Sequence, residues 1–240
     1  MIIVRNIPVT PFIALLAVTL SFAQSDTDFR ISDDSDWWSI IRKNSTNEVL
    51  KPQHQDVDES NFQVLGVAVG RDDLEAIQQK LGAAHVINRG DASTGRSQIC
   101  YAGLDGQTYL TFEIGEVQYG AYLFNHGPRW SGSDQCAKSE FVTSALKTTS
   151  GLRLGQTPAG VQAILGKPTT ARRNGDFVYF RQLRKRTSAV DLEKAKRQYP
   201  NMNEKEFHET YDYYDASFFI VARFSGSRLV YLGLSKADTD

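Results

Sequence analysis

The side chains that could support catalysis or bind a metal ion are few and scattered along the chain. The four histidines are His54, His85, His126 and His208, and no two of them have an HxH or HxxxH spacing. Such spacings place two imidazoles on one metal ion. No GxSxG nucleophile motif occurs either. The sequence therefore predicts no catalytic residue, no metal site and no cofactor, and it favours a protein that is not an enzyme.

Acidic residues are grouped at three places, 33–34, 56–59 and 72–73. The first two groups lie in predicted linkers, and the third lies at a predicted helix start, where a carboxylate complements the helix dipole. Catalysis by residues that are distant in sequence remains open. It would require a pocket in which two or more titratable side chains converge.

A basic run, Arg181–Arg186 together with Arg172 and Arg173, is the strongest charge cluster. It could hold an acidic partner or lipid headgroups. Alternatively, it is a solvated strand end that is balanced by acidic residues in the segment that follows. The net charge of the chain is -1, so no broad nucleic-acid-binding surface is expected.

Cys100 and Cys136 are the two cysteines of the chain. In an oxidising compartment a lone pair of this kind is expected to form a disulfide. Two free thiols or a catalytic cysteine are the alternatives, although no CxxC motif is present.

The first residues have the pattern of a secretory signal. Arg5 precedes an apolar run, Phe12–Phe22, and small residues at Ser21 and Ala23 favour cleavage after Ala23. The run is shorter than the roughly 20 residues that span a bilayer, and no cysteine follows it for a lipid anchor. We therefore expect residues 1–23 to be removed and the protein to be periplasmic or secreted, without a membrane span.

The rest of the chain contains one pattern twice. Gly66–Gly70 and Gly151–Gly155 both read glycine, aliphatic, any residue, aliphatic, glycine, and each is followed by a short apolar stripe at helical spacing. Caps are expected at Asp72 or Asp73 and at Thr157, and glycines 82 and 166 occupy the C-cap positions. We predict an α+β fold made of two tandem units, each with short helices packed on an antiparallel sheet.

The predicted boundaries follow from this pattern. A polar leader with a short helix covers residues 24–61, the first unit covers 62–146, and the second covers 147–240 with a charged insertion at 185–210. Whether the two units share one sheet stays open. The strands are predicted at 98–102, 108–114, 117–124, 177–181, 211–224 and 228–234.

The motif at Gly151–Pro168, GLRLGQTPAGVQAILGKP, resembles the small outer-membrane-assembly lipoproteins of the SmpA/OmlA group. It is also similar to the β-lactamase-inhibitor protein, a tandem of the same unit. The first unit matches at Gly66, Gly70, the helix and Gly82. The resemblance implies helices layered on an antiparallel sheet and activity through protein binding. The lipidated cysteine of the lipoproteins has no counterpart here.

Strand alternation predicts which face could bind. In 211–224 the residues Ala216, Phe218, Ile220, Ala222 and Phe224 should meet the helices. The opposite face is expected to carry tyrosine and arginine, the composition of binding surfaces, unless it is covered and forms a second core. The predicted binding residues are Tyr109, Tyr179, Arg181, Tyr211, Tyr213, Phe219 and Arg223.

The expected function is a non-enzymatic protein-binding module, either an adaptor or an inhibitor, whose partner is an envelope or secreted protein. The alternative is a small-molecule or lipid binder with a cleft between the two units.

Overall fold

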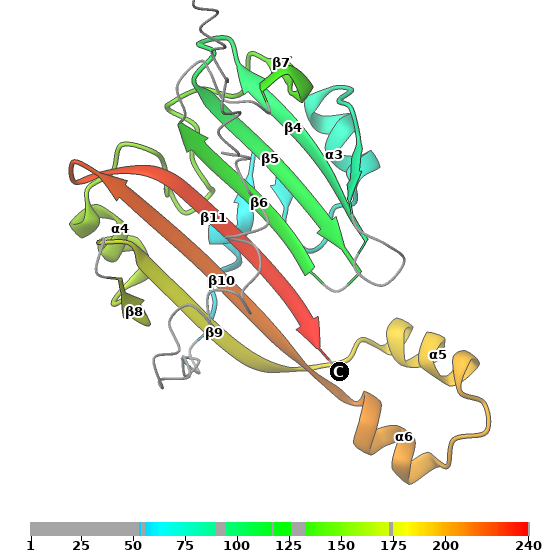
Figure 1. Cartoon of the computed structure of the whole chain (residues 1–240). Helices are drawn as coiled ribbons and strands as arrows, with labels where there is room; N and C mark the ends of the chain where they lie inside the picture. Colours follow the sequence, from blue (N-terminus) through cyan, green and yellow to red (C-terminus); the bar gives the residue numbers. More distant parts are fainter. Residues whose placement is uncertain are drawn as a thin grey trace, which may run out of the picture.

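The computed structural model describes residues 53, 56–89, 95–116, 118–125, 133–172 and 175–239. The expected signal peptide, most of the leader with its short helix, His54 and His126 lie outside these residues. The described part is one large, mostly antiparallel sheet with helices packed against it (Figure 1). The α+β class predicted from sequence is therefore confirmed.

Nine strands form the sheet, in the order β3-β4-β5-β6-β11-β10-β9-β8, with β7 pairing to β4 in parallel. Their bounds are β3 (Ile87–Arg89), β4 (Arg96–Gly103), β5 (Thr108–Gly115), β6 (Gln118–Asn125), β7 (Ala137–Ser139), β8 (Thr170–Ala171), β9 (Phe177–Arg186), β10 (Tyr213–Ser225) and β11 (Arg228–Thr239). The strands assigned to the first unit thus fill one half of the sheet, and those of the second unit fill the other half.

The two halves join where β6 pairs with β11. The pairing runs from Phe124 opposite Tyr231 to Gln118 opposite Ala237. The register is continuous, so the residues assigned to the two units share one sheet. This answers the question that the repeat pattern left open.

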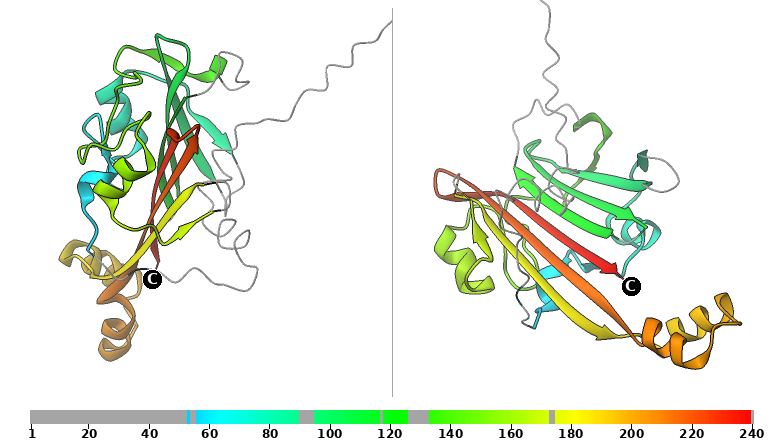
Figure 2. Two further views of the ribbon diagram at one scale, coloured as in Figure 1. Left: turned by 90° about the vertical axis from the view of Figure 1, so that its left-hand side faces the viewer. Right: turned by 60° about the horizontal axis from the view of Figure 1, so that its bottom comes forward.

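Two short helices, α3 (Leu74–Leu81) and α4 (Pro158–Leu165), cover the same face of the sheet (Figure 2). Each helix begins at a predicted cap: the Asp73 side chain accepts a hydrogen bond from Ala76 N, and Thr157 does the same for Gly160 N. Capping satisfies a backbone donor that the first helical turn leaves unpaired. Both helices end one residue before a glycine with positive φ, at positions 82 and 166, as the sequence predicted.

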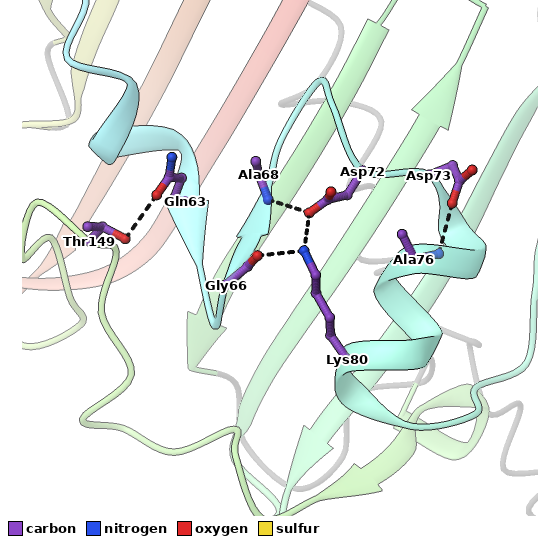
Figure 3. Close-up of polar contacts among 8 residues, drawn as sticks. All are labelled: Gln63, Gly66, Ala68, Asp72, Asp73, Ala76, Lys80 and Thr149. Atoms are coloured by element: carbon purple, nitrogen blue, oxygen red, sulfur yellow. Dashed lines mark hydrogen bonds and ion pairs between the residues drawn. The ribbon is translucent and has the colours of Figure 1, made fainter.

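The hairpin that precedes α3 consists of β1 (Gln63–Val64) and β2 (Val67–Ala68). Figure 3 shows how Asp72 ties it to the helix: the carboxylate accepts from Ala68 N at 2.8 Å and from Lys80 Nζ at 2.6 Å. Lys80 also donates to Gly66 O at 2.7 Å. Partial burial opposes ionisation of Asp72, but these two hydrogen bonds lower its pKa. The acidic pair at 72–73 is therefore explained by structure, with one carboxylate bracing the hairpin and the other capping the helix.

A buried tyrosine closes the end of each helix. Tyr101 Oη on β4 donates to Gly82 O at 2.8 Å, and Tyr179 Oη on β9 donates to Gly166 O at 3.2 Å. The two bonds satisfy carbonyl groups at the ends of α3 and α4, where backbone acceptors lack helical partners. Burial raises the pKa of both hydroxyls, that of Tyr179 to about 12.

We expect Tyr101→Phe and Tyr179→Phe to destabilise the protein by similar amounts, each by about 1 kcal/mol, because each removes one hydrogen bond from a helix end. The pKa of Tyr179 lies above its ordinary value of 10.0 in the folded state. Its contribution is thus complete below pH 10 and is lost as pH rises toward 12. Urea unfolding at pH 7 and at alkaline pH measures both effects. A Tyr179→Phe variant as stable as the wild type at pH 7 would contradict the prediction.

The main core lies between the helices and the sheet. Leu110 and Phe112 of β5 and Phe218 and Ile220 of β10 point into it, as strand alternation predicted. The helices contribute their apolar stripes, including Ile77, Leu81, Val161 and Leu165. Phe224 is partly buried against the same cluster.

Candidate binding surface

The second face of the sheet carries a buried aromatic layer. Tyr109 and Phe219 lie on it as predicted, but they are only 1% and 4% exposed. They belong to a cluster, here called the second-face cluster, made of Cys100, Ala102, Tyr109, Tyr122, Phe124, Val178, Phe180, Phe219, Val221 and Tyr231. These residues form a second core, the alternative to an open face that the sequence left unresolved. Tyr109 and Phe219 are therefore not available to a partner in this structure.

The prediction that Tyr179 and Arg181 join this face is wrong. In the β9–β10 register, Phe219 lies opposite Phe180 and Ile220 lies opposite Tyr179. Cross-strand neighbours point to the same side of a sheet, so Tyr179 and Arg181 face the helices. Arg181 donates from Nη2 to Leu165 O at 2.7 Å. It thus caps the end of α4, where a cation also complements the helix dipole.

Arg223 is held by neighbouring groups. Its side chain forms an ion pair with the buried carboxylate of Asp176, Nε to Oδ2 at 3.6 Å, and its guanidinium lies 5.1 Å from the centre of the Tyr231 ring. Removing it would leave Asp176 without this ion pair, which gives Arg223 a structural role that the sequence did not indicate.

Tyr211 and Tyr213 lie together at the base of a helical projection. Residues 187–212 connect β9 to β10 and contain α5 (Ala189–Gln198) and α6 (Glu204–Tyr211); we call this segment the arm. Figure 1 shows it extending beyond the end of the sheet. Tyr211 is the last residue of α6, and the prediction that it begins the strand is wrong by two residues because β10 begins at Tyr213.

Local signals determine the two helices of the arm. The Ser188 side chain accepts from Asp191 N at 3.1 Å, and the Asn203 side chain accepts from Glu206 N at 2.8 Å. Thr187 N donates to Asp212 O at 2.9 Å and closes the base of the arm. The matching connection in the first half of the sheet, between β4 and β5, is a turn at residues 104–107. The arm therefore joins its two strands at a place where the other half of the sheet has a tight turn.

Aromatic rings hold the two arm helices together. Tyr199 stacks on Tyr211 with ring centroids 5.5 Å apart, and Phe207 lies 5.0 Å from Tyr211. Phe207 is buried, whereas Tyr199 is 41% exposed. Tyr213, at the base of the arm, is 47% exposed and is covered on one side by the guanidinium of Arg184 at 5.1 Å. The arm and its base therefore present one partly exposed aromatic ring each, Tyr199 and Tyr213, and both rings are held by neighbouring groups.

A groove of about 540 Å³ lies between α5 and the end of the sheet. Its lining includes Arg186, Lys194, Tyr199, Tyr211 and Tyr214. Lys194 pairs with Asp191 at 3.3 Å. The groove thus combines tyrosine and arginine, the residue types that contribute most to protein–protein binding energy. Tyr211 was among the binding residues predicted from sequence, and Arg186 belongs to the basic run that could hold an acidic partner, whereas Lys194, Tyr199 and Tyr214 were not predicted. The apolar positions Phe207 and Tyr211, four residues apart in a charged segment, are the signal of an amphipathic helix beside the groove.

A second, smaller cavity of about 180 Å³ lies beside a one-turn helix, η1 (Glu59–Phe62), on the helix face of the sheet. Glu59 accepts from Lys185 at 3.2 Å and from Lys236 at closer range. Glu59, Lys185 and Lys236 are far apart in the sequence, but they meet at this cavity. Catalysis would also require titratable side chains to converge in this way.

No group of three or more His, Cys, Asp or Glu side chains in the described residues could hold a metal ion. Within the same ranges, no helix is long and apolar enough to cross a membrane. Comparisons of the chain with models of protein families, with curated proteins and with solved structures found no match.

Proposed function

We propose that this protein is an exported, non-enzymatic protein-binding module of the cell envelope or its surroundings, and that the arm is its contact surface. The observation that carries the proposal is the groove beside α5, in which ordered tyrosines and a basic side chain lie on a projection that reaches beyond the sheet. The apolar run at Phe12–Phe22 and the Cys100–Cys136 disulfide support export.

The chemistry of the groove indicates what the partner presents. Three tyrosine rings can bury an apolar or aromatic side chain, and Arg186 has no ion-pair partner among the described residues. A partner with an aromatic or aliphatic side chain beside a carboxylate would fit both features. Rings that are already stacked lose little conformational entropy on binding, which favours affinity.

The two-unit origin predicted from sequence belongs to the same proposal. Each half of the sheet has a capped helix, a short edge strand and three longer strands in the same order, and each helix ends on a tyrosine hydroxyl. We infer that the chain contains a duplicated unit, and that this unit resembles the one in the SmpA/OmlA group and in the β-lactamase-inhibitor protein. The arm is then an addition to the second copy, which would give that copy a distinct role.

The alternative, a small-molecule or lipid binder, was expected to use a cleft between the two units. β6 and β11 pair directly at that junction. The larger cavity described above lies at the arm, within the second unit. The cavity beside η1 is lined by residues of both predicted units, but its volume of about 180 Å³ admits only a single small group. We therefore favour a protein partner.

We expect Tyr199→Ala and Arg186→Ala each to weaken partner binding about tenfold or more, because both side chains line the groove and because ordered aromatic side chains and arginines are typical hot spots. The exported chain would be used to capture proteins from an envelope extract, and the affinity of each captured protein would then be measured for every variant. Replacing residues 187–212 with the four-residue turn found at 104–107 should abolish binding of the true partner.

Phe141→Ala is the matched control, since Phe141 is an exposed aromatic residue in the other half of the chain. It should leave the affinity unchanged. A captured protein that binds the arm-replaced variant as well as it binds the wild type would contradict the proposal. Circular dichroism on every variant would show that the sheet is intact.

A further inference from the structure

The cavity beside η1 contains more positive than negative charge. Lys185, Lys236 and Arg71 line it together with one carboxylate, that of Glu59. Three cations and one carboxylate leave a net charge of +2 among the lining residues. Such a surplus inside a concave site attracts anions, because low-dielectric walls strengthen the field within it.

The two ammonium groups have hydrogen-bonding capacity that the described residues do not use. Each carries three N–H donors, and Glu59 is the one hydrogen-bond acceptor that either lysine contacts within the described ranges. Both also lie over the ring of Phe218, Lys185 at 4.7 Å and Lys236 at 5.4 Å from its centre. These contacts position the two ammonium groups side by side at the cavity.

Lys236 is held in place by its surroundings. Its side chain is 16% exposed and its ammonium lies 5.1 Å from the centre of the Phe62 ring. Its stem crosses Gly70, where an added Cβ would lie 2.9 Å from Lys236 Cδ. Gly70 also has a φ of 83°, a conformation that favours glycine. The close approach adds a second reason for glycine at this position: it leaves room for the lysine.

Electrostatics agrees with the geometry. Burial lowers the pKa of Lys236, the hydrogen bond from Lys236 to Glu59 opposes that effect, and repulsion by Lys185 and Arg71 lowers the pKa further. Burial raises the pKa of Glu59, but its contacts with Lys236 and Lys185 outweigh this and lower it overall. An added anion would relieve the repulsion among the cations.

We propose that the cavity beside η1 is an anion-binding site that accepts one small oxyanion or carboxylate group, such as inorganic phosphate or a glutamate side chain. The site borders the groove of the arm, because Tyr214 lines both, but the proposal rests on the lysines and Glu59 and does not depend on the function proposed for the arm. A cavity of about 180 Å³ admits one such group and little more. A structural ion-pair cluster between η1 and the sheet would explain the contacts of Glu59 with both lysines, but it would not require the third cation, Arg71.

The test compares inorganic phosphate and tri-glutamate as ligands, by calorimetric titration and by thermal unfolding at constant ionic strength set with sodium chloride. At a hundredfold excess over Kd, either ligand should raise the unfolding midpoint by about 5–10 °C. Lys236→Met and Lys185→Met should each weaken binding about tenfold or more, since each removes a charge-assisted hydrogen bond. Lys205→Met, which removes an exposed charge on α6, is the matched control and should have no effect.

The Glu59→Gln variant distinguishes between two interpretations of the cluster, an anion-binding site and a purely structural ion pair. It removes the competing carboxylate, so phosphate should bind more tightly than to the wild type, whereas a purely structural cluster would gain no affinity. If Lys236→Met fails to fold, the more exposed Lys185→Met and Glu59→Gln carry the test.

The two ligands distinguish the source of the anion. Binding of phosphate without tri-glutamate indicates a free oxyanion, and binding of tri-glutamate that phosphate displaces indicates an acidic side chain of a protein ligand. No stabilisation by either ligand beyond that of sodium chloride, or equal stabilisation of the Lys185→Met/Lys236→Met double variant, overturns the proposal. Either result would leave the arm experiment unaffected.

Discussion

Replacing both cysteines with alanine is expected to lower the free energy of unfolding by about 4 kcal/mol, the value that chain entropy assigns to a loop of this length. Cys100 and Cys136 are bonded and lie 36 positions apart. The loop they close contains β5 and β6, the strands that lead to the junction with β11. Without the bond, the unfolded chain has more conformational entropy, and folding must overcome that additional entropy.

The measurement is thermal unfolding of the Cys100→Ala/Cys136→Ala variant, and the midpoint should fall by roughly 8–16 °C for a protein of this size. Cys100 is buried in the second-face cluster, so part of the loss could come from packing. Reducing the wild-type disulfide isolates the cross-link, because it leaves both sulfur atoms in place. A wild-type midpoint that does not change on complete reduction would show that the bond constrains nothing.

Phe62→Ala is expected to cost about 3–5 kcal/mol, the range observed when a large buried ring is removed. Phe62 is buried in the main core, and its ring meets Phe218 edge to face with centroids 5.5 Å apart. Lys236 also lies over it. The substitution would leave a void under η1 and would remove support from the ammonium group at the proposed anion site.

Urea unfolding would measure the loss. Phe62→Leu keeps most of the volume and should cost less than about 1.5 kcal/mol. Phe141→Ala, at an exposed position, should stay within about 0.5 kcal/mol of the wild type. A loss below about 1 kcal/mol in Phe62→Ala would mean that η1 packs less tightly than the structure shows, and it would also weaken the case for an ordered cavity beside it.

Local features were the most predictable part of this protein. The caps at Asp73 and Thr157 and the glycines at 82 and 166 delimit both core helices, because capping and positive φ depend on a few neighbouring residues. The inward faces of β5 and β10 were also predicted correctly, since side chains at every second position of a strand point to the same side of the sheet, and Leu110, Phe112, Phe218 and Ile220 keep that spacing.

The β9 strand shows where alternation fails. Val178, Tyr179 and Phe180 are all buried although they are consecutive. A strand that is covered on both faces loses the period-two signal from which its orientation could be inferred. The predicted binding face was therefore assembled partly from the wrong side of the sheet, and its aromatic residues proved to be a second core.

The sequence by itself determined the helix ends, the paired cysteines, the α+β class and the place of an insertion after β9. The tertiary structure decided that the two halves share one sheet, that the insertion forms an arm with an aromatic groove, and that Glu59 meets Lys236 across 177 positions of the chain. Caps and turns depend on short-range backbone geometry, which a single sequence encodes. The pairing of β6 with β11 and the convergence of distant charges depend on how the strands assemble, which periodicity along the chain does not encode.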